Sequence, residues 1–243
     1  MRSQLSILAA RLAAPLVALA VPLIAGEAAR AGGNDVLVEL FTSQGCNSCP
    51  PADAALGEYA ALEGVVALSL HVDYWDYLGW RDTFADSAHT KRQYAYRAAF
   101  GERAVYTPQI VVDGRTGVVG SKKAQVAALI ADAQHTSPGA GIRLDATDDG
   151  LVAMLSPGAV EGPFTVWCAV YDRSRTVAIG RGENRGKTLT YSNVVRELRR
   201  LAEWTAQAPQ RVKVLRPASG QGVAVWVQRG EGGPVLGAAK YEP

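Results

Sequence analysis

The 243-residue sequence has few cysteines, few histidines and no block of like charge, and each shortage excludes a class of protein. Twenty-five Lys and Arg residues are interspersed with 23 Asp and Glu residues, which leaves a net charge of +2. Because no basic run follows the pattern of a phosphate-binding surface, we expect no nucleic-acid partner. Beyond the N-terminal region no apolar segment approaches the roughly 20 residues that span a bilayer.

The chain has only three cysteines, Cys46, Cys49 and Cys168, and an odd number leaves one thiol over after pairing. Cys46 and Cys49 are too close in sequence to tie distant elements together. A disulfide between them is therefore expected to serve in a reaction and not to stabilise the fold. Cys168 lies in an apolar run, which predicts a buried side chain. No second Cys-x-x-Cys or His-x₃-His completes a closed structural zinc site.

Residues 1–31 have the pattern of a cleaved secretory signal peptide. Basic residues precede an almost wholly apolar stretch over 12–25, and Ala29 and Ala31 fit the small-x-small rule for cleavage. The apolar stretch is shorter than the roughly 20 residues of a membrane span. We therefore expect a periplasmic or secreted protein that has no stable membrane insertion after cleavage.

Residues 34–136 combine strand and helix patterns and predict an α/β domain. The apolar runs at 36–41 and 65–72 predict buried strands, and the helical spacing at 52–62 completes a βαβ unit with a partly parallel sheet. The pattern continues with a helix, a hairpin that turns at an Asp-Gly pair and a last helix, at 87–100, 105–120 and 122–134.

Residues 137–243 predict a second, β-rich domain. Short apolar strands, including separate ones at 164–171 and 177–179, alternate with turn clusters, which is typical of an antiparallel sandwich or barrel. The segment 188–204 fits either a helix or a long strand.

The motif Cys46-Asn47-Ser48-Cys49 directly follows the first predicted strand. A strand that ends before such a turn, with a helix after it, presents both sulfurs at a sheet edge, where one thiolate attacks and the other thiol resolves the mixed disulfide. Cys46, at the loop end, is expected to be the more exposed, attacking thiol and Cys49 the resolving one. The same spacing also suits soft metal ions.

This order of elements, with Thr107-Pro108 opening a hairpin ahead of the last helix, resembles the thioredoxin fold. In that superfamily the X-Pro bond is cis and lies beside the dithiol, which implies that Thr107 and Pro108 hold the substrate backbone. Longer strings resemble a family of secreted bacterial proteins that is thioredoxin-like but has no assigned function; they lie at 39–46, 49–53, 71–76 and 182–186. The similarity covers most of the mature chain and implies a fold and a dithiol site but no substrate.

The surroundings of the motif depart from ordinary thioredoxins. Gly45 stands where those enzymes usually carry a tryptophan. Pro50 and Pro51 fit only the first turn of a helix, so the helix should begin near Cys49. Asp53 lies in that turn, where its charge would disfavour a nearby thiolate. The redox direction is therefore open.

Further candidates lie after the second predicted strand. His71 and Asp73 are expected to reach the dithiol, where His71 would act as a proton carrier or a third metal ligand; a satisfied core histidine fits equally well. Four aromatic residues either rim a substrate groove or pack a domain interface: Tyr74, Trp75, Tyr77 and Trp80. The charged turn at 181–187 either contacts the first domain or a partner, or is a solvated loop.

The sequence thus predicts an exported thiol–disulfide oxidoreductase that uses Cys46 and Cys49, acts on a protein or a small thiol and needs no cofactor. Two alternatives stay open. One is a copper or zinc chaperone that binds metal through Cys46, Cys49 and His71. The other is a non-catalytic thioredoxin-like adaptor that binds partners through its β-rich part.

Overall fold

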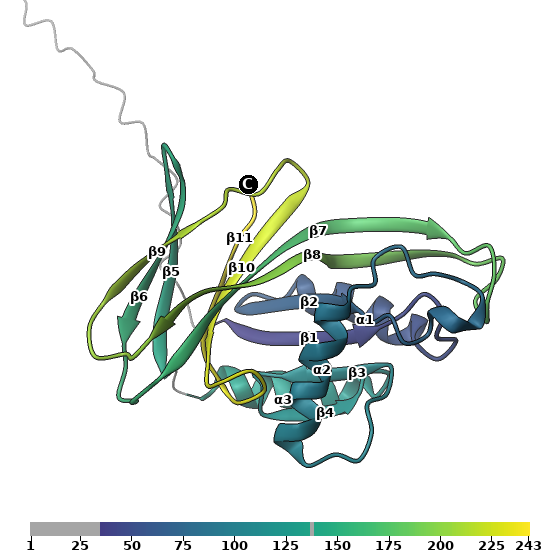
Figure 1. Ribbon diagram of the computed structural model, residues 1–243, viewed down its shortest axis with the longest axis horizontal. Helices are drawn as coiled ribbons and strands as arrows, with labels where there is room; N and C mark the ends of the chain where they lie inside the picture. The colour runs from purple at the N-terminus through teal and green to yellow at the C-terminus, as the bar shows by residue number, and fades with distance from the viewer. Residues whose placement is uncertain (1–34, 137–138) are drawn as a thin grey trace, which may run out of the picture.

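The computed structural model describes residues 35–136 and 139–243 and shows a mixed α/β fold (Figure 1). In chain order the elements are β1 (Val36–Thr42), α1 (Pro50–Ala60), β2 (Val65–His71), the 3₁₀ helix η1 (Asp76–Leu78), α2 (Ser87–Phe100), β3 (Gln109–Val112), β4 (Thr116–Val119), α3 (Lys123–Gln134), β5 (Ala140–Thr147), β6 (Gly150–Pro157), β7 (Phe164–Ala178), β8 (Thr188–Trp204), β9 (Gln210–Val214), β10 (Gln221–Gln228) and β11 (Val235–Tyr241). The predicted signal peptide at 1–31 lies outside the described residues. Within them, no helix has the length and apolar character needed to cross a membrane.

A single eight-stranded mixed sheet runs through most of the described chain, with the strand order β11-β10-β7-β8-β2-β1-β3-β4. β1 and β2 are parallel, whereas β3 pairs antiparallel with both β1 and β4. β8 joins this group at one pair, Ser69 with Val194. Strands from 34–136 and from 137–243 therefore share one sheet, while β5, β6 and β9 form a separate three-stranded sheet.

β7 and β8 form a long antiparallel hairpin. Residues 188–204, which fitted either a helix or a strand, are the strand β8. The prediction of two separate strands at 164–171 and 177–179 was wrong, because β7 is one strand from Phe164 to Ala178. Its polar segment 172–176 breaks the apolar pattern since most of its side chains are exposed, yet the backbone keeps its ladder to β8.

β1 and β2 are buried along their whole length because different elements cover their two faces. Val38 and Leu40 of β1 pack into a cluster with α1 and α3, whereas Leu37 and Phe41 pack into the cluster on the opposite face, which includes α2. Continuous burial of this kind explains why most positions of this parallel pair are apolar. The polar residues of the two strands are buried as well: Glu39, Thr42, Ser69 and His71.

The three-stranded sheet packs against the other end of the large sheet, away from α1 and α3 (Figure 1). Its core side chains meet alternate residues of β7 and β10, such as Cys168 and Val225. The intervening residues, such as Trp167 and Trp226, point to the opposite face and belong to the cluster that contains α2.

A buried ion pair lies on that opposite face. The Arg92 guanidinium of α2 donates to the Glu39 carboxylate of β1 with Nη2 2.9 Å from Oε2, and the two side chains are 2% and 0% exposed. The same guanidinium lies over the rings of Trp226 and Trp167, at 5.0 and 5.2 Å from their centroids. This contact ties α2 and β1 to the strands of the C-terminal half.

Candidate dithiol site

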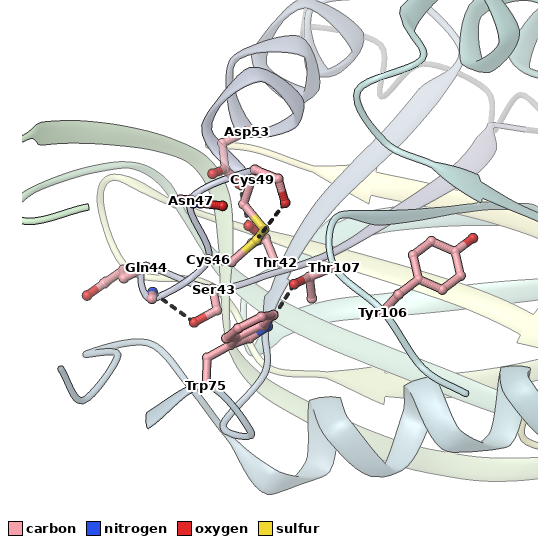
Figure 2. Close-up of a disulfide and its surroundings, with 12 residues drawn as sticks. Thr42, Ser43, Gln44, Cys46, Asn47, Cys49, Asp53, Trp75, Tyr106 and Thr107 are labelled. Atoms are coloured by element: carbon pink, nitrogen blue, oxygen red, sulfur yellow. Dashed lines mark hydrogen bonds between the residues drawn. A yellow bond between two sulfur atoms is a disulfide. The ribbon is translucent and has the colours of Figure 1, made fainter. Parts of the chain in front are cut away.

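Cys46 and Cys49 form a disulfide where β1 ends and α1 begins (Figure 2). The backbone turns tightly here, since the Cys46 N–H donates to the Ser43 carbonyl and the Cys49 N–H donates to the Cys46 carbonyl. Cys49 is the N-cap of α1, and prolines occupy the first helical positions, where no N–H is needed for the helix.

Both sulfur-bearing side chains are buried. Cys46 is 1% exposed and Cys49 is 0% exposed, so the expectation of an exposed Cys46 was wrong. Asn47 and Ser48, between them, are the exposed residues of the motif. The reason is tertiary, because segments distant in sequence pack around the loop.

One of these segments supplies a tryptophan beside the disulfide. A Cβ atom added at Gly45 would lie 3.2 Å from the Cβ of Trp75, so the absence of a side chain at Gly45 makes room for Trp75. The Trp75 indole Nε1 donates to Thr107 Oγ1 at 2.8 Å (Figure 2). The Thr107–Pro108 peptide bond is cis, as the resemblance implied. Trp75 therefore packs against the residue that directly precedes Cys46.

Gln44 anchors the chain just before the motif. Its backbone N–H donates to Asp82 Oδ2 at 2.7 Å, and its side-chain carbonyl accepts a hydrogen bond of 2.8 Å from the Trp80 indole. Trp80 therefore helps to hold the chain that leads into the dithiol loop, whereas Tyr77 is 78% exposed.

The loop between β7 and β8 closes over the motif. The Asn184 side-chain amide is buried and donates to the carbonyls of Gln44 and Cys46, at 2.9 and 2.8 Å. Glu183 Oε2 accepts the Asn47 N–H at 3.2 Å, and Lys187 Nζ donates to Asn184 Oδ1 at 2.8 Å. The charged turn at 181–187 thus contacts the dithiol loop through Glu183 and Asn184, although most of its residues are exposed. No local pattern indicated this role for Asn184.

Asp53 lies beneath the disulfide in the first turn of α1. It follows Cys49 by four residues, which places both side chains on one face of the helix. Thr42 Oγ1 donates to Asp53 Oδ1 at 2.7 Å, while Oδ2 has no hydrogen-bond partner among the described residues. Burial raises the pKa of Asp53 to about 7, against the opposing effects of the nearby His71 charge and the Thr42 hydroxyl.

His71, at the end of β2, pairs with Asp82 and lies beside Asp53. Its Nδ1 is 2.7 Å from Asp82 Oδ2, and both side chains are fully buried. Burial alone would raise the pKa of Asp82, but the His71 charge and hydrogen bonds from His71, Gln44 and Phe84 lower it overall. His71 is the register partner of Thr42, so both side chains lie on the α1 face. The Nε2 atom has no partner in the described chain, so His71 is only half satisfied.

The remaining sequence candidates lie elsewhere. Thr90 Oγ1 of α2 donates to the Asp73 carboxylate at 2.6 Å, so Asp73 is engaged with α2. Cys168 is a buried free thiol in the core between the two sheets. Across the described ranges, no three His, Cys, Asp or Glu side chains gather in a way that could hold a metal ion.

The chain is similar to a family model and to a solved structure. A family model described as "Protein of unknown function (DUF1223)" matches residues 37–228. A crystal structure of a protein from Agrobacterium tumefaciens is similar over 85% of this chain and 93% of its own, with 34% identity and a TM-score of 0.73. A comparison with curated proteins found no match.

Proposed function

The chain belongs to the DUF1223 family of proteins of unknown function, and we propose that it is an extracytoplasmic thiol–disulfide oxidoreductase acting on a protein or small thiol. The observation that carries the proposal is the Cys46–Cys49 disulfide, which caps a helix with the buried Asp53 beneath it. The order β2-β1-β3-β4 and the cis Thr107–Pro108 bond support a thioredoxin-like N-terminal part.

The electrostatic surroundings of the disulfide suit exchange. The N-terminus of α1 favours a thiolate at the capping position. The Ser48 hydroxyl lies 3.4 Å from the Cys46 sulfur, close enough to donate to a Cys46 thiolate. Because burial raises the pKa of Asp53 to about 7, this carboxyl carries a proton much of the time near neutral pH, so it opposes a thiolate less than the sequence indicated.

The proposed reaction oxidises a substrate dithiol. One substrate thiolate attacks Cys46 Sγ, the Cys46–Cys49 bond breaks, and Cys49 leaves as a thiolate that takes the proton of Asp53. The second substrate thiolate then attacks the substrate sulfur of the mixed disulfide and releases Cys46. The substrate loses two electrons and the protein gains two, and the reverse sequence of steps reduces a substrate disulfide.

Access to Cys46 requires a local opening of the loop that covers it. Glu183 holds Asn47 through one exposed hydrogen bond of 3.2 Å, which a docking substrate can replace. The exposed Asn47 and Ser48 are the residues of the motif that a substrate meets first.

Matched cysteine variants test the proposal. Cys46→Ser should abolish reduction of insulin disulfides and exchange with a dithiol peptide, whereas Cys49→Ser should accumulate a mixed disulfide at Cys46. Cys168→Ser, which removes the thiol in the other core, is the control and should keep full exchange. Equal activity of wild type, Cys46→Ser and Cys49→Ser would exclude the proposed function.

A second candidate, a non-catalytic adaptor, is favoured by the burial of both sulfurs. It predicts that the disulfide of the native protein resists millimolar dithiothreitol and becomes reducible only after unfolding. Rapid reduction of the native protein would exclude the adaptor. No observation favours the copper or zinc chaperone, because both thiols are joined in the disulfide and, within the described ranges, no three His, Cys, Asp or Glu side chains gather in a way that could hold a metal ion.

A further inference from the structure

A cavity of about 480 Å³ lies between the two sheets and shares no residue with the dithiol site. Residues of β6, β7, β8 and β9 line it, and β9 is an edge strand of the three-stranded sheet. Its volume falls within the roughly 300–1,000 Å³ of small-molecule sites. The cavity is therefore large enough for a ligand.

The wall of the cavity is mainly apolar. Leu151 and Cys168 are buried in the core between the sheets, and Val170 and Leu201 pack against that core from partly buried positions. Leu215 extends the apolar surface outward, since it is 59% exposed. An apolar surface thus continues from the core to the solvent.

The β7–β8 ladder is irregular at this wall. Its register shifts between Val166 and Trp167 and again between Val170 and Tyr171, so Cys168 lies between two irregularities. Bulges bend strands and occur preferentially next to sites. This is a second feature, independent of volume, that sets the wall apart from the rest of the hairpin.

Positive charge gathers around the cavity. Arg199, Arg211 and Lys213 line it, against a single carboxylate from Asp149. Arg199 is paired with Glu197. Arg211 and Lys213 are exposed, and neither side chain has a hydrogen bond or ion pair within the described ranges. Two cations are thus free to meet an anion.

We propose that this cavity binds a single-chain amphiphile with an anionic head group, of the class of long-chain carboxylates. The alkyl chain lies against Cys168, Val170 and Leu201, and the carboxylate pairs with Arg211 and Lys213. Cations on an edge strand also discourage unwanted strand pairing. That role alone, however, does not require an apolar cavity beside them.

Displacement of a fluorescent fatty acid tests the proposal on the full-length protein. Dansylaminoundecanoate should bind with one-to-one saturation, and dodecanoate should displace it. Dodecyltrimethylammonium, which has the same chain and the opposite charge, should not. The double variant Arg211→Glu/Lys213→Glu should bind dodecanoate at least tenfold more weakly than wild type. The control Lys91→Glu with Lys122→Glu makes the same charge change at exposed positions outside the cavity and should bind as wild type.

Cys168 provides a second readout, because the other two cysteines are paired. Saturating dodecanoate should slow the modification of Cys168 by methyl methanethiosulfonate several-fold in wild type and not in the Arg211/Lys213 variant. Absence of saturable binding, equal displacement by the cationic amphiphile, equal weakening in both double variants, or no protection of Cys168 would each overturn the proposal. None of these outcomes depends on the redox activity of Cys46.

Discussion

Asn184, in the loop between β7 and β8, donates a 2.8 Å hydrogen bond to the carbonyl of Cys46, 138 residues earlier in the chain. With its second bond to the Gln44 carbonyl, this buried amide fixes the backbone that leads into the disulfide. The C-terminal half of the chain therefore shapes the dithiol loop directly. Asn184 is a positioning residue, because it touches the backbone of the loop and not a sulfur.

Replacing Asn184 should loosen the dithiol loop. Asn184→Ala leaves the buried Gln44 carbonyl without a donor and removes one of the two donors to the Cys46 carbonyl, which should cost about 1–3 kcal/mol of the free energy of unfolding. The disulfide should also be reduced several-fold faster by dithiothreitol under native conditions, as followed by thiol labelling. Arg185→Ala, at the exposed neighbouring position, should change neither quantity. An unchanged reduction rate in Asn184→Ala would show that the loop is held by other contacts.

Asp53 should make stability fall as the pH rises. Because burial raises the pKa of Asp53 from 3.8 to about 7, the folded protein holds a proton that the unfolded chain has lost between these values. The contribution of this group to the free energy of unfolding is thus fully present below about pH 4, decreases as the pH rises toward 7 and is lost above that. Asp53→Asn removes this penalty and should raise the free energy of unfolding at pH 8 by about 2–4 kcal/mol. Urea unfolding from pH 4 to pH 8 measures the difference, which should vanish at the acid end.

Gly45 should tolerate no side chain without a shift of Trp75. The 3.2 Å approach that a Cβ atom would make means that Gly45→Ala displaces the indole and weakens its bond to Thr107. We expect a loss of about 1 kcal/mol in the free energy of unfolding, typical of mild overpacking, and a shift of the Trp75 indole N–H resonance. Gly141→Ala is the control, since its Cβ would make only an ordinary contact of 3.4 Å with Ser156. A stable Gly45→Ala variant with an unmoved resonance would contradict this packing.

The buried pair of Arg92 and Glu39 should be far more sensitive to substitution than an exposed one. Arg92→Met leaves the Glu39 carboxylate buried and unpaired, which should cost about 3–5 kcal/mol. Arg92→Met combined with Glu39→Gln should recover part of that loss, because no charge is then buried alone. Lys123→Met removes the exposed Lys123–Glu58 pair and should leave stability unchanged. Additive losses in the Arg92/Glu39 double variant would show that the two side chains are not coupled.

Local patterns predicted the elements that carry their own start and stop signals. The helix expected at 87–100 is α2, because the Asp86 side chain caps its first turn and Gly101 ends it in the left-handed conformation. The helix expected at 52–62 is α1, shifted to Pro50–Ala60 since the two prolines occupy its first turn. The apolar pattern failed where a single strand passes from buried to exposed positions, as over 172–176 of β7. The sequence therefore predicted two strands there instead of one.

The sequence by itself determined that a Cys-x-x-Cys turn joins a buried strand to a helix, because spacing, prolines and apolar periodicity act over a few residues. Only the tertiary structure decided that Cys46 is buried, that Trp75 lies beside Gly45 and that Asn184 holds the loop. Each of these contacts joins segments that are distant along the chain. They exist because β7 and β8 extend the sheet of the first half, and no local pattern encodes where a hairpin of the second half will lie.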